Sequence, residues 1–191
     1  MTWAIGNGES RTKIDVNNLK GIKVGCNAIV RDFTVDIVVC VDRRMVTEAI
    51  EGNFKNKILT RHEWIDRFSA DNVHTVSNLP YKGDQRADEP FQWGSGPYAV
   101  LEAALLSKKV KMLGFDLYSD TQTINNIYKD TNNYDPATKS PIDPRYWIHQ
   151  IGKVFESFPR KHFIIYQKEG WKLPKAWKHP NVLLDNISKI V

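Results

Sequence analysis

Short apolar runs alternate with polar or helix-forming stretches along the first third of the chain. The runs at 2–5, 22–26, 36–41 and 57–60 are predicted to be strands. The run 36–41 is almost entirely apolar rather than alternating, which is typical of a central parallel strand buried on both faces. The stretches 43–51 and 62–68 carry apolar residues at helical spacing. This alternation predicts βαβ units, and therefore an α/β domain in which helices flank a mainly parallel sheet in three layers.

The rest of the chain extends the same pattern. Residues 77–93 are polar and contain two prolines and a glycine, so they are predicted to form a long surface connection. A helix over 98–106, with Pro97 in its first turn, leads to a strand over 110–115. Residues 119–143 are rich in Asn, Asp, Thr and Ser and are predicted to be an irregular segment or lid. Next, the sequence predicts a helix over 144–158 with Asp143 as its N-cap. It then predicts strands at 162–166 and 182–184 and a short helix over 185–190.

Composition is consistent with one domain over residues 1–191. The chain is 41% hydrophobic and 26% charged. These proportions exclude disordered and low-complexity classes. Cys26 and Cys40 lie inside apolar runs without metal-ligand spacing and are predicted to be reduced core residues. No apolar run approaches the length of a membrane span, so we expect a cytoplasmic protein. The sequence does not indicate the oligomeric state. The net charge of +5 could indicate nucleic acid, a phosphorylated small molecule or no particular partner.

Polar residues follow the first three predicted strands at the points where these strands end. Because the carboxyl ends of parallel strands meet at one edge of a sheet, these residues should form one rim where a nucleotide binds. A turn or a helix cap explains each of them singly, so their convergence carries the prediction. The predicted nucleotide-binding residues here are Gly6, Asn7, Gly8, Ser10, Asn27 and Asp42.

Two later motifs should reach the same rim. Gly94, Ser95 and Gly96 precede a helix, where free N–H groups and the helix dipole favour a phosphate or carboxylate. They do not form the GxSxG turn of a serine hydrolase. The strand over 110–115 then delivers Asp116 and Tyr118 to the rim.

With these motifs in order, the chain resembles the bacterial family 42 sialyltransferases and, more distantly, the sialyl motifs of animal enzymes. It is similar also to the 6-hydroxymethylpterin diphosphokinase (MptE-like) family. The resemblance is carried by GNGES, CNAI, GSGPYAVLEAALL and VKMLGFDLY, and covers residues 3–42 and 94–118. It implies a single Rossmann-like nucleotide-binding domain that transfers a sugar from a CMP-sugar donor to a hydroxyl acceptor without a metal cofactor.

The sialyltransferase resemblance also implies roles for individual residues. Asn7 and Asn27 would contact the nucleotide and its phosphate, Ser95 and Gly96 the cytosine or the sugar carboxylate, and Tyr118 the phosphate. Tyr128 or Tyr134 could supply a second phosphate contact. The family uses a His as general base in the loop before the late helix, where this chain has none, so His149 inside that helix is the candidate. His149 and Asp116 are therefore the predicted catalytic residues.

Other functions stay open at this stage. In the diphosphokinase-like alternative, Asp42 and Asp116 would bind Mg-ATP, since carboxylates suit Mg²⁺. A second alternative is a nucleotide-binding module that has lost catalysis. The basic C-terminal tail, 168–191, interleaves lysines and tryptophans over 168–179 and could bind nucleic acid, although a solvated face is favoured. Trp64, Trp171 and Trp177 are predicted to be packing residues.

Overall fold

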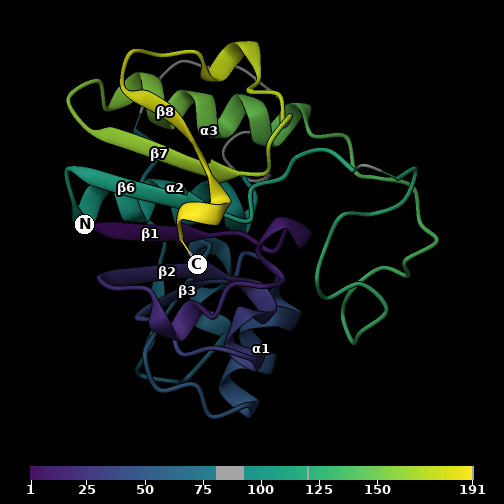
Figure 1. Ribbon diagram of the computed structural model, residues 1–191. Helices are drawn as coiled ribbons and strands as arrows, with labels where there is room; N and C mark the ends of the chain where they lie inside the picture. The colour runs from purple at the N-terminus through teal and green to yellow at the C-terminus, as the bar shows by residue number, and fades with distance from the viewer. Residues whose placement is uncertain (81–92, 120, 191) are drawn as a thin grey trace.

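The chain folds around one sheet of eight parallel strands, as seen in a computed structural model that describes residues 1–80, 93–119 and 121–190 (Figure 1). The strand order is β5-β4-β3-β2-β1-β6-β7-β8. The strands are β1 (Thr2–Ile5), β2 (Ile22–Cys26), β3 (Ile37–Val39), β4 (Lys57–Thr60), β5 (Val73–Thr75), β6 (Lys109–Leu113), β7 (His162–Gln167) and β8 (Val182–Asn186). The predicted α/β class with a parallel sheet is confirmed.

Helices cover both faces of the sheet, as the three-layer prediction requires. On one face, α2 (Ser95–Leu106) and α3 (Arg145–Ser157) pack over a core that includes Ala4, Val24 and Met112. On the other face, α1 (Arg43–Glu51) packs over Trp3, Ile5 and Val38. Successive residues of a strand point to opposite faces, which is why Ala4 and Ile5 belong to different cores. α2 is apolar all round and lies buried over most of its length, as expected for a central helix.

Several elements differ from the sequence prediction. Residues 62–67 form a 3₁₀ helix rather than an α-helix, and the third strand is limited to 37–39. The sequence does not predict the strand over 73–75, because a three-residue edge strand is too short to show a hydrophobic period. The strand at 182–186 is longer than predicted, and the turn that follows it is a 3₁₀ helix over 187–189. Most of the predicted 77–93 connection, residues 81–92, lies outside the described residues.

The topology changes direction between β1 and β6. From β1 the chain adds β2 to β5 on one side, and from β6 it adds β7 and β8 on the other. In open α/β sheets, ligands bind beyond the carboxyl ends of the strands at such a switch point. The long segment between β6 and α3 extends past these strand ends (Figure 1).

Two glycines allow the turns after β1 and β6 to touch. The Gly6 amide donates to the Leu113 carbonyl at 2.8 Å, and the Gly8 amide to the Gly114 carbonyl at 2.9 Å. A Cβ on Gly6 would lie 2.4 Å from the Gly114 carbonyl oxygen, and a Cβ on Gly114 would lie 2.6 Å from the Gly6 carbonyl oxygen. Gly114 also has a positive φ, +74 degrees, which favours glycine. Only glycine fits at both positions.

We therefore expect Gly6→Ala to lower the free energy of unfolding by about 3 kcal/mol, because the methyl group would force two backbone turns apart. Urea denaturation at neutral pH measures this. Gly96→Ala is the matched control, because its Cβ would meet only Phe115 at an ordinary 3.4 Å. Equal stability of the two variants would contradict the steric account.

Candidate functional site

A cavity of about 310 Å³ opens at the switch point, at the carboxyl ends of β1, β2 and β6. The turn after β1, the loop before α2 and the turn after β6 all contribute to its wall. The segment between β6 and α3 closes another side through Ile124, Asn125 and Ile142, and α3 contributes Trp147 and Ile151. We call this space the first cavity. Predicted site residues that line it are Gly6, Asn7, Gly8, Asn27, Asp42, Gly94, Ser95, Gly96 and Asp116.

Ser95 joins three of the predicted motifs. Its Oγ donates to Asn27 Oδ1 at 2.8 Å and accepts from the Val41 amide at 3.0 Å. The first residue of α2 is thereby tied to the ends of β2 and β3. Asn27 adopts a positive φ in the left-handed region, which asparagine tolerates better than most residues. Its Oδ1 accepts from Ser95, and no described residue accepts a hydrogen bond from its side-chain Nδ2, so Nδ2 can donate to a ligand.

The turn after β1 rests on a buried guanidinium. Arg11 is 1% exposed. Its Nε donates to the Gly6 carbonyl at 2.7 Å, and its Nη2 donates to Asn7 Oδ1 and to the Tyr128 hydroxyl, each at 3.2 Å. Arg11 forms no ion pair with a carboxylate of any residue that the structure describes. Asp32 interacts with the same Tyr128 hydroxyl and offsets part of this charge from a distance. A buried cation without a direct ion pair still leaves positive potential beside the turn, which favours an anionic ligand there.

Asn7 is held on all sides by the protein. Its Nδ2 donates to the Cys26 carbonyl at 3.1 Å and to the Tyr134 hydroxyl at 3.3 Å. The Ala28 amide donates to the same hydroxyl at 3.4 Å. Burial raises the pKa of Tyr134 and raises the pKa of Tyr128 to about 12, so both phenols remain neutral hydrogen-bonding groups. The side chain of Asn7 thus shapes the turn, and Asn7 is also among the residues that line the cavity.

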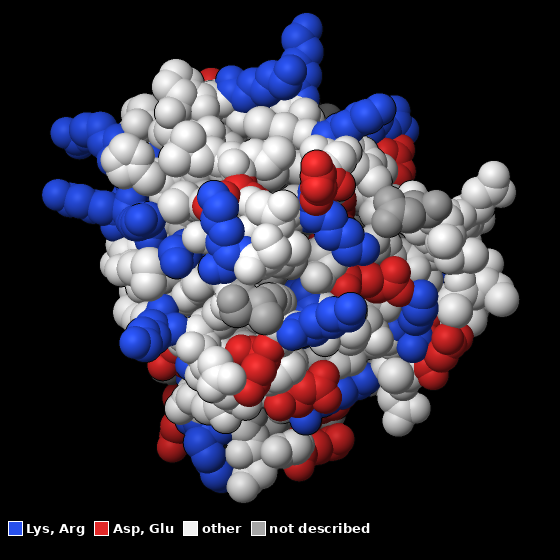
Figure 2. Space-filling model, viewed as in Figure 1, with Lys and Arg blue, Asp and Glu red and all other residues white. Residues whose placement is uncertain are grey.

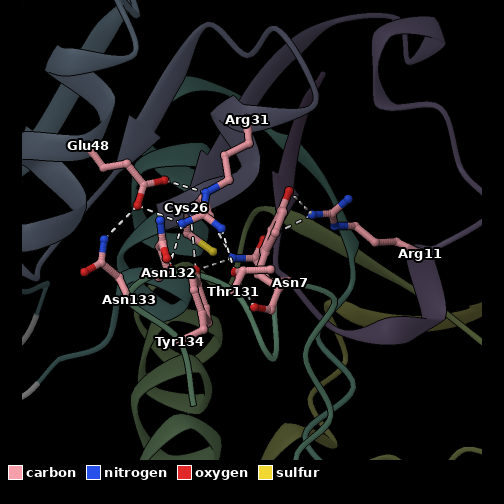
Figure 3. A network of polar contacts seen from close by, with 11 residues as sticks. Asn7, Arg11, Cys26, Arg31, Glu48, Thr131, Asn132, Asn133 and Tyr134 are labelled. Carbon is pink, nitrogen blue, oxygen red and sulfur yellow. Dashed lines mark hydrogen bonds and ion pairs between the residues drawn. The ribbon is translucent and has the colours of Figure 1, made fainter. Parts of the chain in front are cut away.

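A polar network fastens the segment between β6 and α3 to the first half of the chain (Figure 3). Arg31 makes a bidentate ion pair with Glu48 of α1, at 2.5 and 2.7 Å. It also donates to Thr131 Oγ1 at 2.7 Å and to the Asn132 carbonyl at 2.8 Å. Its guanidinium lies over the ring of Tyr134, 5.7 Å from the centroid. One arginine therefore holds residues 131–134 against the ends of β2 and α1.

Asp116 is committed to hydrogen bonds within the chain. Its carboxylate accepts from the Ser10 amide at 2.8 Å, from Ser10 Oγ at 2.5 Å and from Gln167 Nε2 at 3.1 Å. A Cβ on Gly8 would lie 2.4 Å from the Asp116 carboxyl carbon, so the turn passes directly over this carboxylate. Asp116 therefore ties the turn after β1 to the ends of β6 and β7.

Asp42 has the capping role that the sequence offered as an alternative. Its carboxylate accepts from the Arg44 amide at 3.0 Å and pairs with the Arg44 guanidinium at 2.8 Å. The hydrogen bond from Arg44 holds the pKa of Asp42 below its ordinary value, so this carboxylate is ionised at neutral pH. It nevertheless lines the first cavity.

The two acidic residues of the magnesium alternative do not form a ready ligand pair. Asp116 already accepts three hydrogen bonds, and Asp42 is paired with Arg44. Within the described part of the chain there is no cluster of three or more His, Cys, Asp or Glu side chains that could hold a metal ion.

Three predicted site residues do not line the first cavity. Ser10 and Tyr118 line a neighbouring one, described below. His149 lies two residues from both Trp147 and Ile151, which line the first cavity. Because two residues cover a little more than half a helical turn, His149 lies on the opposite side of α3. A role for His149 as a base would require it to act from outside this space.

Sequence reasoning missed the apolar wall of the first cavity. Trp147 and Ile151 are four residues apart on α3 and therefore share one face. That spacing predicts an apolar face but not whether it covers a core or a ligand. Leu117 gives no sequence signal at all, yet it lines the cavity with a positive φ. Backbone conformations strained in this way are common at functional sites.

Comparison with known proteins gives one informative match. No family model and no curated protein matches the sequence. Among solved structures, the fold is similar to that of the sialyltransferase CstII from Campylobacter jejuni, determined in complex with the substrate analogue CMP-3FNeuAc. The TM-score is 0.55 at 13% identity, over 99% of this chain and 96% of that one. The expected sialyltransferase-like α/β fold is confirmed, and membership of a particular family stays a prediction.

No helix among the described residues has both the length and the apolar character needed to cross a membrane.

The Arg31–Glu48 pair predicts a pH dependence of stability. Arg31, and then Asn133, lower the pKa of Glu48 below its ordinary value of 4.5. The unfolded chain therefore binds this proton at a higher pH than the folded chain does. The stabilisation is present above the ordinary pKa and is lost as the pH falls through the lowered pKa.

We expect Glu48→Gln to cost about 1 kcal/mol at neutral pH and less as the pH falls below the ordinary pKa of the carboxyl, as measured by urea unfolding. Asp143→Asn is the control, because the side chain of its partner Arg145 is 83% exposed. An ion pair so open to solvent should contribute little at any pH. A cost of Glu48→Gln that does not change with pH would contradict the ion-pair account.

Proposed function

We propose that this protein is a glycosyltransferase that binds a nucleotide-sugar of the CMP type in the first cavity and transfers the sugar to a hydroxyl acceptor. Two lines of support meet at the same place. The fold is similar to that of a sialyltransferase determined with a CMP-sugar analogue. The cavity lies at the switch point of the sheet, where α/β folds bind nucleotides.

The observation that carries the proposal is the buried, unpaired charge of Arg11. It lies behind the turn that lines the cavity and makes no ion pair among the described residues. Across the cavity, α2 begins with Gly94, Ser95 and Gly96, so backbone N–H groups and the positive end of the helix dipole add to the same potential. Asp32 interacts with the Tyr128 hydroxyl that Arg11 also contacts, so it reaches the guanidinium only indirectly. A phosphate between these elements would add negative charge on the cavity side of the turn.

The remaining polar groups suit the sugar parts of such a donor. The amide nitrogen of Asn27 can donate to a hydroxyl or carboxylate oxygen, and the ionised carboxylate of Asp42 can accept from ribose hydroxyls. Because Asp42 is paired with Arg44, its repulsion of a nearby phosphate is reduced. We assign Asp116 a positioning role, since its carboxylate acts on the turn after β1 through Ser10.

In the proposed reaction, the acceptor oxygen forms a bond to the anomeric carbon of the donor sugar. The bond from that carbon to the phosphate oxygen breaks, the phosphate keeps the electron pair, and the acceptor proton passes to a base. Negative charge develops on the phosphate, where the N-terminus of α2 lines the cavity and the field of Arg11 acts from behind the turn. The chain thus supplies a fixed electrostatic environment for the leaving group.

Nucleotide binding tests the proposal against the diphosphokinase alternative. We expect CMP to raise the melting temperature by several degrees at saturating concentration, equally with and without Mg²⁺. Thermal-shift measurements with CMP, CDP, UDP, GDP and ATP, each with Mg²⁺ or with EDTA, provide the comparison. Stabilisation by ATP only in the presence of Mg²⁺ would favour the alternative, and no response to any nucleotide would contradict both.

Arg11 should discriminate the phosphate from the nucleoside. We expect Arg11→Met to weaken CMP binding by about tenfold or more while changing cytidine binding much less, because only CMP carries the charge. Isothermal titration calorimetry measures both ligands. Arg11→Lys, which keeps the charge, should retain part of the preference for CMP. Urea unfolding of each variant separates loss of the fold from loss of binding, and an equal loss for both ligands would rule out the electrostatic role.

A further inference from the structure

A second cavity, of about 580 Å³, adjoins the first. Both are lined by Asp116 and Asn125, so the two spaces meet at the end of β6. The other walls of the second cavity come from Ser10, from Tyr118 and from the loop 167–172 after β7. The first cavity is near the lower end of the range of about 300–1,000 Å³ that ligand pockets occupy. A donor nucleotide-sugar placed in the first cavity would leave no room there for a second substrate. The second cavity could take that substrate.

An aromatic pair forms one wall of the second cavity. The rings of Tyr118 and Trp171 lie 6.2 Å apart at an angle of 44°. The Trp171 indole donates to the Asp116 carbonyl at 2.7 Å, and Asn125 Nδ2 donates to the Tyr118 carbonyl at 2.9 Å. The indole and the backbone beneath the phenol are therefore fixed, while Tyr118 remains 39% exposed. The apolar C–H face of a pyranose ring packs well against such fixed aromatic surfaces.

The opening of this cavity is basic. Lys168 and Lys172 line it together with Glu169, and Asp116 lies deeper. Lys175 and Lys178 follow along the same segment, in which Glu169 is the one acidic residue over 168–178. Lys and Arg side chains gather over the part of the molecule where β7, β8 and the C-terminal segment lie (Figure 2). The lysines of this segment outnumber its one acidic residue, and their charge favours a ligand that carries an anionic group.

The buried polar groups favour a sugar over a nucleobase. Recognition of a base needs free donors and acceptors along the wall where its edge would lie. The deep polar groups here, Asp116 and Gln167, are bonded to each other, and Ser10 Oγ donates to the same carboxylate. The exposed charged groups at the opening are Lys168, Glu169 and Lys172, and ammonium groups suit the hydroxyl and carboxylate substituents around a sugar ring.

We propose that the second cavity is the acceptor subsite, and that its ligand is an anionic saccharide whose ring packs on Tyr118 and Trp171 while its charged group meets Lys168 and Lys172. This inference rests on the proposed function, because an acceptor is needed only if the first cavity holds a sugar donor.

Two tryptophans report on the two cavities separately. Trp147 lines the first and Trp171 the second. Their indole N–H resonances in a ¹⁵N-labelled sample are assigned by their loss in Trp147→Phe and Trp171→Phe. Titration with D-glucuronate and with D-glucose, alone and in the presence of saturating CMP, then compares an anionic and a neutral sugar of the same ring. We expect glucuronate to shift the Trp171 resonance at lower concentration than glucose does.

Paired charge variants test the role of the lysines. Lys168→Gln combined with Lys172→Gln should raise the Kd for glucuronate about fivefold to tenfold and leave the Kd for CMP unchanged, because two exposed ion pairs are lost outside the first cavity. Lys175→Gln combined with Lys178→Gln removes the same charge from the same segment without touching the cavity. It should raise the Kd for glucuronate much less than the first pair does, because only a distant charge is lost, and leave the Kd for CMP unchanged.

Three results would overturn the proposal. They are a Trp171 resonance that no saccharide shifts, equal affinities for glucuronate and glucose, and a shift of Trp171 by cytidine without one by the sugars, which would make the cavity a base subsite. Failure of the proposed function has a different signature: the Trp147 resonance would not respond to CMP, whatever Trp171 does.

Discussion

The site depends on one buried cation. The Arg11 guanidinium lies beneath the turn after β1, where it holds the Gly6 carbonyl, the Asn7 side chain and the Tyr128 hydroxyl together. Space for it exists because the neighbouring turn carries no side chain at Gly114, whose Cβ would lie 3.2 Å from the arginine Cδ. Burial of an unpaired charge is costly unless polar groups surround it, so the carbonyl and hydroxyl dipoles are what make this arrangement tolerable. The same cost makes an anionic ligand favourable at this turn.

The segment between β6 and α3 is part of the site rather than a connection past it. It contains no helix or strand in its described part, residues 119 and 121–143, yet Ile124 and Tyr128 are buried and the Ile127 amide donates to the Asn7 carbonyl at 2.9 Å. Arg31 bonds to Thr131 in the middle of this segment and to Glu48 of α1, so it holds the two together. An irregular backbone can wall a cavity because its polar groups find partners in side chains and in neighbouring turns rather than in a ladder.

The two cavities would give the two substrates of the proposed transfer reaction adjoining places. Asp116 and Asn125 belong to both walls, and Asp116 also fixes the turn after β1 through Ser10. An anion held in the first cavity and a sugar on the aromatic pair of the second would therefore meet over one shared carboxylate and amide. Residues that bond to the protein on one side and face a cavity on the other shape the site without touching the reacting atoms.

The sequence alone determined the parallel sheet, its central strands and the rim of strand ends. Apolar runs identify the strands, and the polar residues directly after them place Gly6, Asn27 and Asp42 at one edge. The order of the strands in the sheet came only from the tertiary structure. Only the tertiary structure decided four other features. They are the pairing of Asp116 with Ser10, the burial of Arg11, the position of His149 away from the first cavity, and the adjoining aromatic cavity. Hydrophobic periodicity reports how each residue relates to its own element. These features join residues far apart in the sequence or depend on which face of α3 packs against a neighbour, and no local pattern carries that information.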